Sequence, residues 1–130
     1  MKIRTDFVTN SSSTSYIILY KLSESDEKST KKLNDVIETL LNAYGCMETS
    51  IARKLDNTDD LFKATERWRG DTKEEFLEKN SDAKKLYTLI DSYISQGYKL
   101  AIKYVDDIDT VTMAIIKTLS ENNEDFIVIT

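Results

Sequence analysis

In the last third of the chain, the spacing of apolar residues changes from that of a strand to that of a helix and back to that of a strand. This pattern constrains the fold most. Apolar side chains occupy every second position over 98–105, follow helical spacing over 108–119, and run continuously from Phe126 to Ile129. Such a strand–helix–strand unit normally closes as a right-handed crossover with parallel strands. The sequence therefore predicts two parallel strands in one sheet, the first with one buried face and one mostly polar face.

A second apolar run, Tyr16–Tyr20, is short, continuous and rich in residues that favour strands. It predicts a strand that is buried on both faces and therefore joins the same sheet. Apolar residues at helical spacing over 33–44 predict an amphipathic helix that starts near Ser29 or Thr30. Further helices are predicted as follows: a short one within Cys46–Leu55, one capped by Asp59 and closed by Gly70, one capped by Thr72, one capped by Asn80 or Ser81 and closed by Gly97, and one capped by Asp107 or Asp109.

These patterns together predict a single small α/β or α+β domain over residues 1–130. The domain has about three strands in one sheet, a C-terminal β-α-β unit, and four to five helices packed on the sheet. Residues 1–14 form a polar segment, rich in Ser and Thr, that leads into the first strand. A chain of 130 residues can bury a sizeable core without metal ions or disulfide bonds.

The composition excludes several classes of chemistry. The chain has no histidine and one cysteine, Cys46, so it can form neither a histidine-based catalytic triad nor an internal disulfide bond. Apolar residues make up 40% of the chain and charged residues 32%, which is the balance of a globular protein. No apolar run approaches the roughly 20 residues of a membrane span, and the N-terminus lacks the apolar core of a secretion signal. We therefore expect a cytoplasmic protein.

The N-terminal segment Lys2–Tyr16 reads Lys-Ile-Arg-Thr-Asp-Phe-Val-Thr-Asn-Ser-Ser-Ser-Thr-Ser-Tyr. It resembles the N-terminal signature Lys-Ile-Arg-x-x-Phe-Val-x-Asn-Ser-Ser-Ser-x-Ser-aromatic of small uncharacterised proteins of low-GC bacteria and their phages. Asp6 stands where those proteins usually carry glycine. The resemblance implies an origin in a phage or a Firmicutes-type bacterium, and it implies no activity. We expect a chain encoded by a phage or another mobile element and located in the cytoplasm of a bacterial host cell.

The hydroxyl-rich tract in this segment has three interpretations. Its hydroxyl groups can bond to neighbouring amides as local turns that lead into the first strand. It can also be a recognition tag that a partner protein binds. Finally, its N–H and hydroxyl groups can converge on an anion such as phosphate, with added charge from a nearby arginine. The candidate residues for a partner or anion site are Arg4, Asn10, Ser11, Ser12, Ser13 and Ser15.

Three aspartates, Asp106, Asp107 and Asp109, follow strand 98–105 at the sheet edge where α/β proteins bind ligands. Their carboxylates match the oxygen ligands that Mg²⁺ takes. An aspartate N-cap with a second carboxylate in the first helical turn explains the same residues. Because no histidine or identified distant carboxylate completes a site, we predict no bound metal and keep these aspartates as candidate ligands.

The segment Arg67–Trp68–Arg69 groups the single tryptophan with two arginines. These residue types are enriched at the energetic centres of protein interfaces, so the segment is a candidate interface. A buried tryptophan flanked by solvated arginines explains the same pattern. The formal charge of -5 disfavours nucleic acid as a partner, because contacts with phosphates dominate that affinity.

The function that these observations favour is a small, non-catalytic protein-binding regulator or inhibitor. The sequence identifies no catalytic residue and no cofactor, although enzymatic activity stays open. The alternative is a phosphate-binding, nucleotide-binding or enzymatic domain that uses Ser11–Ser15, with a metal ion at Asp106–Asp109. A weaker alternative is an acidic decoy for a nucleic-acid-binding protein. We expect a protein partner and no membrane, and self-association of the chain is left open.

Overall fold

The computed structural model describes residues 2–3, 13–24, 27–43, 51–66, 70–106 and 108–130, and it places five helices and five strands among them. In chain order the elements are β1 (Lys2–Ile3), β2 (Ser13–Tyr20), α1 (Lys28–Asn42), β3 (Arg53–Leu55), α2 (Thr58–Glu66), α3 (Lys73–Lys79), α4 (Ser81–Ser95), β4 (Lys99–Asp106), α5 (Thr110–Asn122) and β5 (Phe126–Ile129). The predicted fold class of a single small domain with a C-terminal β-α-β unit is confirmed.

The strands form one sheet in the order β1-β5-β2-β4-β3. Strand β2 is antiparallel to both β4 and β5, so these two run in the same direction, as predicted, with β2 between them. Strand β3 pairs antiparallel with the outer edge of β4, and β1 pairs parallel with β5. Strands β1 and β3 are additions to the three that the sequence predicts.

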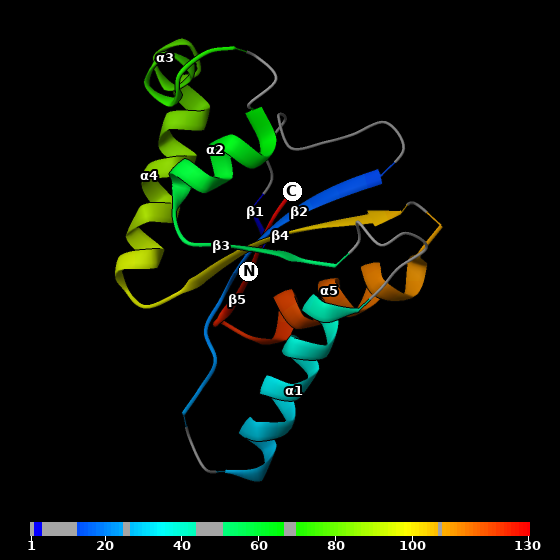
Figure 1. Ribbon diagram of the computed structural model, residues 1–130. Helices are drawn as coiled ribbons and strands as arrows, with labels where there is room; N and C mark the ends of the chain where they lie inside the picture. The colour runs from blue at the N-terminus through cyan, green and yellow to red at the C-terminus, as the bar shows by residue number, and fades with distance from the viewer. Residues whose placement is uncertain (1, 4–12, 25–26, 44–50, 67–69, 107) are drawn as a thin grey trace.

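The same strand–helix–strand unit occurs twice along the chain, as β2-α1-β3 and as β4-α5-β5. In the sheet, β4 lies between the two strands of the first unit, and β2 lies between the two strands of the second. This arrangement is the split β-α-β pattern of β-α-β-β-α-β folds. Helices α1 and α5 cover one face of the sheet, while α2, α3 and α4, inserted between β3 and β4, cover the other (Figure 1). The domain therefore has three layers, with the sheet in the middle.

Side chains alternate between the two cores along each strand, as the pleat requires. On β2, Ile17 and Leu19 face α2–α4, and Ile18 and Tyr20 face α1 and α5. All four are buried, so the prediction of a strand covered on both faces is confirmed. The prediction of a mostly polar face for strand 98–105 is wrong, because α1 and α5 cover that face and Lys103 is only 1% exposed there.

The region predicted as a short helix within Cys46–Leu55 contains a strand instead. Arg53–Leu55 pairs with β4, and Leu55 lies opposite Leu100 with both side chains in the core. Hydrogen bonds along the β4 edge and burial of Leu55 outweigh the weak helical spacing of this stretch. The remainder of the predicted helix, including Cys46, lies outside the described residues.

Two of the predicted helix caps are confirmed. Thr72 caps α3, with its hydroxyl oxygen accepting from the Glu75 N–H at 3.2 Å, and Asp109 caps α5 by accepting from the Thr112 N–H at 3.1 Å. Such bonds satisfy N–H groups that the first helical turn leaves without partners.

One predicted cap is corrected, and another is in its predicted place without a side-chain bond. Helix α2 is capped by Asn57 rather than Asp59, because the Asn57 Oδ1 accepts from the Asp60 N–H at 2.9 Å and places Asp59 in the first turn. Asn80 stands at the N-cap of α4, as one of the two predicted positions, but its side chain makes no cap bond there; its amide donates to the Phe76 carbonyl at 2.9 Å, at the end of α3.

Candidate binding site

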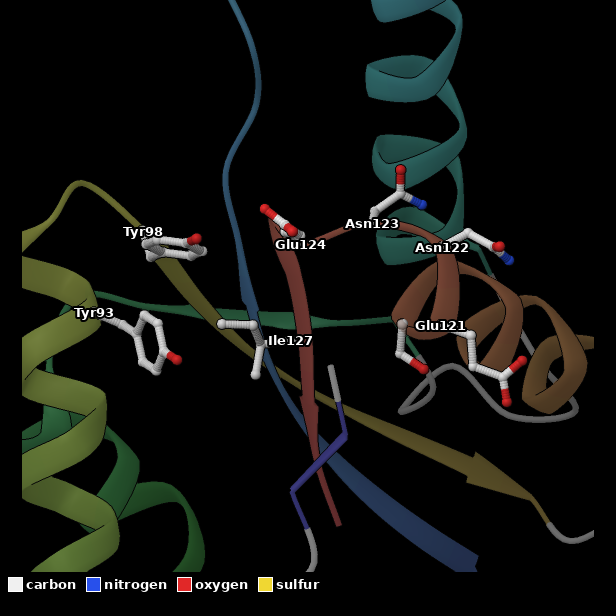
Figure 2. A pocket seen from close by; sticks show the side chains of 8 residues that line it. Tyr93, Tyr98, Glu121, Asn122, Asn123, Glu124 and Ile127 are labelled. Carbon is white, nitrogen blue, oxygen red and sulfur yellow. The ribbon is translucent and has the colours of Figure 1, made fainter.

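A cavity of about 590 Å³ opens between the C-terminal ends of α4 and α5 (Figure 2). Its volume lies within the range of sites that hold small ligands or side chains of a partner. Two tyrosines form one wall, and the end of α5 with the turn before β5 forms the other. The lining residues are Tyr93, Tyr98, Ser120, Glu121, Asn122, Asn123, Glu124 and Ile127.

The turn that ends α4 fixes the tyrosine wall. Gly97 has a φ of 96°, a left-handed conformation that glycine adopts without a steric penalty and that reverses the chain toward β4. The Tyr98 N–H then donates to the Tyr93 carbonyl at 3.1 Å. Their rings meet edge to face, with centroids 5.1 Å apart and an angle of 68° between the planes. Aromatic pairs favour this arrangement.

The opposite wall carries negative charge. The Asn123 N–H donates to the Leu119 carbonyl at 3.1 Å, which ends α5, and the Phe126 N–H returns to the Asn123 carbonyl at 3.3 Å. This turn leaves the carboxylates of Glu121 and Glu124 exposed to solvent. The described lining of the cavity contains these two carboxylates and no basic residue.

Tyr98 already contacts a cation and an anion of its own chain. The Lys21 ammonium lies 5.3 Å from the centroid of the Tyr98 ring, and the Tyr98 hydroxyl donates to Asp125 Oδ1 at 3.3 Å. Burial raises the pKa of the Tyr98 hydroxyl, and the negative charges of Asp125 and Glu124 raise it further. The surroundings of this ring are therefore favourable for positive charge.

The described part of the hydroxyl-rich tract lies in β2, at the other end of the sheet. Ser13 pairs with Asp106 in the sheet register, and the side chain of Ser15 is buried. The fold therefore places Ser13 of the serine tract beside Asp106 of the aspartate group, although the two candidate sites lie far apart in the sequence. Arg4, Asn10, Ser11 and Ser12 lie outside the described residues, and an anion site there stays a prediction.

The described aspartates of the candidate metal site act as local hydrogen-bond acceptors. Asp106 Oδ1 accepts from the Ile108 N–H at 3.3 Å, and Asp109 accepts from both the N–H and the hydroxyl of Thr112. These Thr112 bonds lower the pKa of the Asp109 carboxyl. Within the part of the chain that the structure describes, no three potential ligands gather to hold a metal ion. Asp107 lies outside that part.

Sequence reasoning missed Lys103, a buried charged residue between α1 and α5. Its ammonium donates to the Ala43 carbonyl at the end of α1, at 3.1 Å. Burial lowers the pKa of Lys103, and the negative charge of Asp109 partly offsets that effect. A cation suits both the carbonyl end of one helix and the carboxylate that begins the other. Lys103 therefore interacts with both helices. In the sequence, the only indication of this residue is its position in the alternating pattern of strand 98–105.

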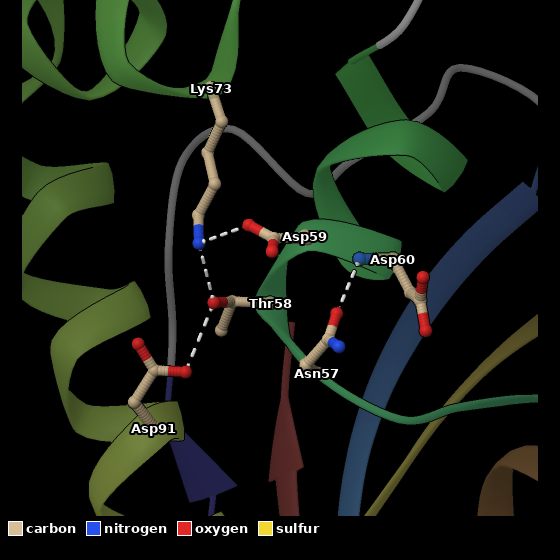
Figure 3. Close-up of polar contacts among 6 residues, drawn as sticks. All are labelled: Asn57, Thr58, Asp59, Asp60, Lys73 and Asp91. Atoms are coloured by element: carbon tan, nitrogen blue, oxygen red, sulfur yellow. Dashed lines mark hydrogen bonds and ion pairs between the residues drawn. The ribbon is translucent and has the colours of Figure 1, made fainter.

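A second polar group lies where α2, α3 and α4 meet (Figure 3). The Lys73 ammonium donates to Asp59 Oδ1 at 2.7 Å and to the Thr58 hydroxyl at 2.9 Å, and that hydroxyl donates to Asp91 Oδ1 at 3.0 Å. The hydrogen bond and charge of Lys73 lower the pKa of Asp59. Each bond connects two helices, which indicates a structural role.

Replacing Lys73 with methionine should raise the Asp59 pKa toward its ordinary value, because Lys73 is the main cause of its lowering. NMR titration of the Asp59 carboxyl in both proteins measures this change. In the wild type, the contact stabilises the fold above the ordinary aspartate pKa and is lost as pH falls through the lowered value. An unchanged Asp59 pKa in the variant would contradict the role assigned to Lys73.

The candidate interface Arg67–Trp68–Arg69 lies outside the described residues and stays a prediction. Among the described residues, no helix is long and apolar enough to cross a bilayer. Comparisons with protein-family models, curated proteins and solved structures find nothing that matches this chain. What the fold and the cavity define is a small α+β protein with a tyrosine-lined, acidic depression at one end of its sheet.

Proposed function

We propose that this chain is a small, non-catalytic protein-binding regulator or inhibitor, and that the cavity of Tyr93, Tyr98, Glu121 and Glu124 binds a basic side chain of its partner. The observation that carries the proposal is the composition of the two walls: an edge-to-face tyrosine pair opposes two carboxylates. Tyrosine is enriched at the energetic centres of protein interfaces because it buries a large surface at a small entropic cost.

The chemistry of the cavity favours lysine or arginine in the partner. The contact of the Lys21 ammonium with the Tyr98 ring supports the binding of a cation at this wall. The carboxylates attract positive charge and repel phosphate, so a basic protein segment fits better than a nucleic acid. Because both carboxylates are exposed, their contribution is modest and decreases with salt.

Titration with a short peptide rich in lysine and arginine tests the proposal. The NMR signals of Tyr93 and Tyr98 should shift, and the double substitution Glu121→Gln and Glu124→Gln should raise the dissociation constant about three- to tenfold, because each exposed charge pair contributes up to about 1 kcal/mol. The matched control is Glu74→Gln with Glu78→Gln, which removes the same charge from the exposed side of α3. Equal weakening by both pairs would show that only net charge matters and would contradict the proposal.

A further inference from the structure

Two asparagines at the end of α5 present amide oxygens to the cavity between α4 and α5 (Figure 2). The Asn122 amide nitrogen donates to the Thr118 carbonyl at 2.8 Å. In the same way, the Asn123 amide nitrogen donates to the Leu119 carbonyl at 3.1 Å. Each nitrogen is therefore bonded to its own helix, whereas the oxygen of the same amide remains to accept a hydrogen bond from a ligand.

Two of the three hydroxyl groups in the cavity lining also act as acceptors toward a ligand. The Ser120 hydroxyl donates to the Lys117 carbonyl at 2.8 Å, and the Tyr98 hydroxyl donates to Asp125 Oδ1 at 3.3 Å. A hydroxyl group has a single hydrogen to donate. Because that hydrogen is already bonded within the chain, a ligand meets only the oxygen of these two groups.

The carboxylates of Glu121 and Glu124 complete this pattern. An ionised carboxylate accepts hydrogen bonds and donates none. Four consecutive residues, Glu121–Glu124, therefore supply side-chain oxygens to the cavity, and we call them the acceptor wall. A phosphate, a carboxylate or a carbonyl group in a ligand would meet mostly acceptors there. The lining instead suits a ligand group that carries several hydrogens to donate and no acceptor.

Among basic side chains, the guanidinium group of arginine fits this lining better than the ammonium group of lysine. A guanidinium group has five N–H donors in one plane and no acceptor, so it can bond to oxygens of more than one residue at once. Its flat faces stack on aromatic rings, and it is less strongly hydrated than an ammonium group. The tyrosine pair opposite the acceptor wall provides the aromatic surface for such stacking.

We propose that the cavity selects arginine over lysine, with the guanidinium group stacked on Tyr93 or Tyr98 and its N–H groups bonded to oxygens of the acceptor wall. This proposal rests on the function proposed above, because it names which basic side chain of the partner the cavity binds. The occupant is an arginine within a peptide chain rather than free arginine, whose carboxylate would be repelled by Glu121 and Glu124.

Three blocked tripeptides test the choice of side chain: acetyl-Gly-X-Gly-amide with arginine, lysine or citrulline at X. Citrulline keeps the planar shape of arginine, but it is neutral and has a carbonyl oxygen in place of one nitrogen. In NMR titrations followed at Tyr93 and Tyr98, the arginine peptide should bind about three- to tenfold more tightly than the lysine peptide. The citrulline peptide should bind at least about tenfold more weakly than the arginine peptide, since it loses the charge and brings an acceptor to the acceptor wall.

The outcomes of these titrations separate the two proposals. Equal binding of the arginine and lysine peptides, or tighter binding of lysine, would overturn the selection of arginine and leave the proposed basic partner intact. Citrulline binding as tightly as arginine would overturn the need for a guanidinium cation. Free arginine that binds more tightly than the blocked peptide would overturn the assignment to a peptide chain. If neither basic peptide shifts the tyrosine signals, both proposals are wrong.

The ratio of the lysine to the arginine dissociation constant tests the acceptor wall itself. The double substitution Glu121→Gln and Glu124→Gln should bring this ratio close to one, because an amide cannot accept two parallel N–H bonds from a guanidinium group as a carboxylate does. Loss of charge alone would weaken both peptides equally and leave the ratio unchanged. The matched control, Glu74→Gln with Glu78→Gln on α3, should keep the wild-type ratio. A ratio that the cavity variant leaves unchanged would overturn the role of the two carboxylates in selecting arginine.

Discussion

Replacing Phe76 with alanine should lower the free energy of unfolding by about 3–5 kcal/mol, the range for truncating a buried aromatic residue. Phe76 is the one buried side chain of the seven-residue helix α3. Its ring lies between two others, with its centroid 5.6 Å from that of Phe62 and 6.1 Å from that of Tyr87. The substitution therefore removes the contact that joins α3 to both α2 and α4, and a short helix has little stability of its own to offset this loss.

Urea denaturation followed by circular dichroism measures the effect of Phe76. The control is Phe76→Leu, which keeps a smaller apolar side chain in the core and should cost less than Phe76→Ala. A further control, Leu77→Ala, truncates the half-buried neighbour in the same helix and separates the role of Phe76 from the helix propensity of α3. A loss below about 1 kcal/mol for Phe76→Ala would show that α3 does not depend on this contact.

The parts of the fold that local patterns encode could be predicted from the sequence. The run Tyr16–Tyr20 indicated a strand covered on both faces because a continuous apolar run cannot leave either face in water. Thr72 is recognisable as a cap, and Asp109 as one of two candidate caps with Asp107, because short polar side chains before an apolar helix satisfy its first N–H groups. The common direction of β4 and β5 followed from the length and spacing of the helix between them.

The parts that depend on distant contacts could not be predicted. Strand β3 has three residues, and its pairing with β4 rather than its own composition makes it a strand. Lys103 was assigned to a polar face because nothing local shows that α1 and α5 both cover β4. The insertion of β2 between β4 and β5 likewise has no local signal.

The candidate cavity also depends on the fold. Tyr93 and Tyr98 fall on the apolar sides of a predicted helix and strand, a pattern typical of core residues, and no sequence motif marks the carboxylates of Glu121 and Glu124. The end of α4 lies beside the end of α5 because β4 and β5, which follow these helices, begin at the same end of the sheet. This arrangement depends on the strand order. A site built from the ends of separate elements becomes visible when their arrangement is known.

Replacing Tyr87 with phenylalanine should make the protein more resistant to alkaline unfolding. Burial raises the pKa of the Tyr87 hydroxyl to about 12; a hydrogen bond with Thr65 opposes this rise and the charge of Glu66 adds to it. In the unfolded chain this hydroxyl ionises near its ordinary value of 10.0. Between these two values the folded state keeps a proton that the unfolded state has released, so stability falls as pH rises.

The size of this effect follows from the difference between the two pKa values. A rise of about two units corresponds to about 2–3 kcal/mol, which is fully present below pH 10 and is lost as pH rises through about 12. At neutral pH, Tyr87→Phe loses the bond with Thr65 and should be less stable by about 0.5–1.5 kcal/mol. The stability curves of the two proteins should therefore cross in alkali, although Tyr20 and Tyr98, whose pKa values are also raised, leave some pH dependence in both. Parallel curves from pH 9 to about 12 would show that Tyr87 ionises equally easily in the folded and unfolded states.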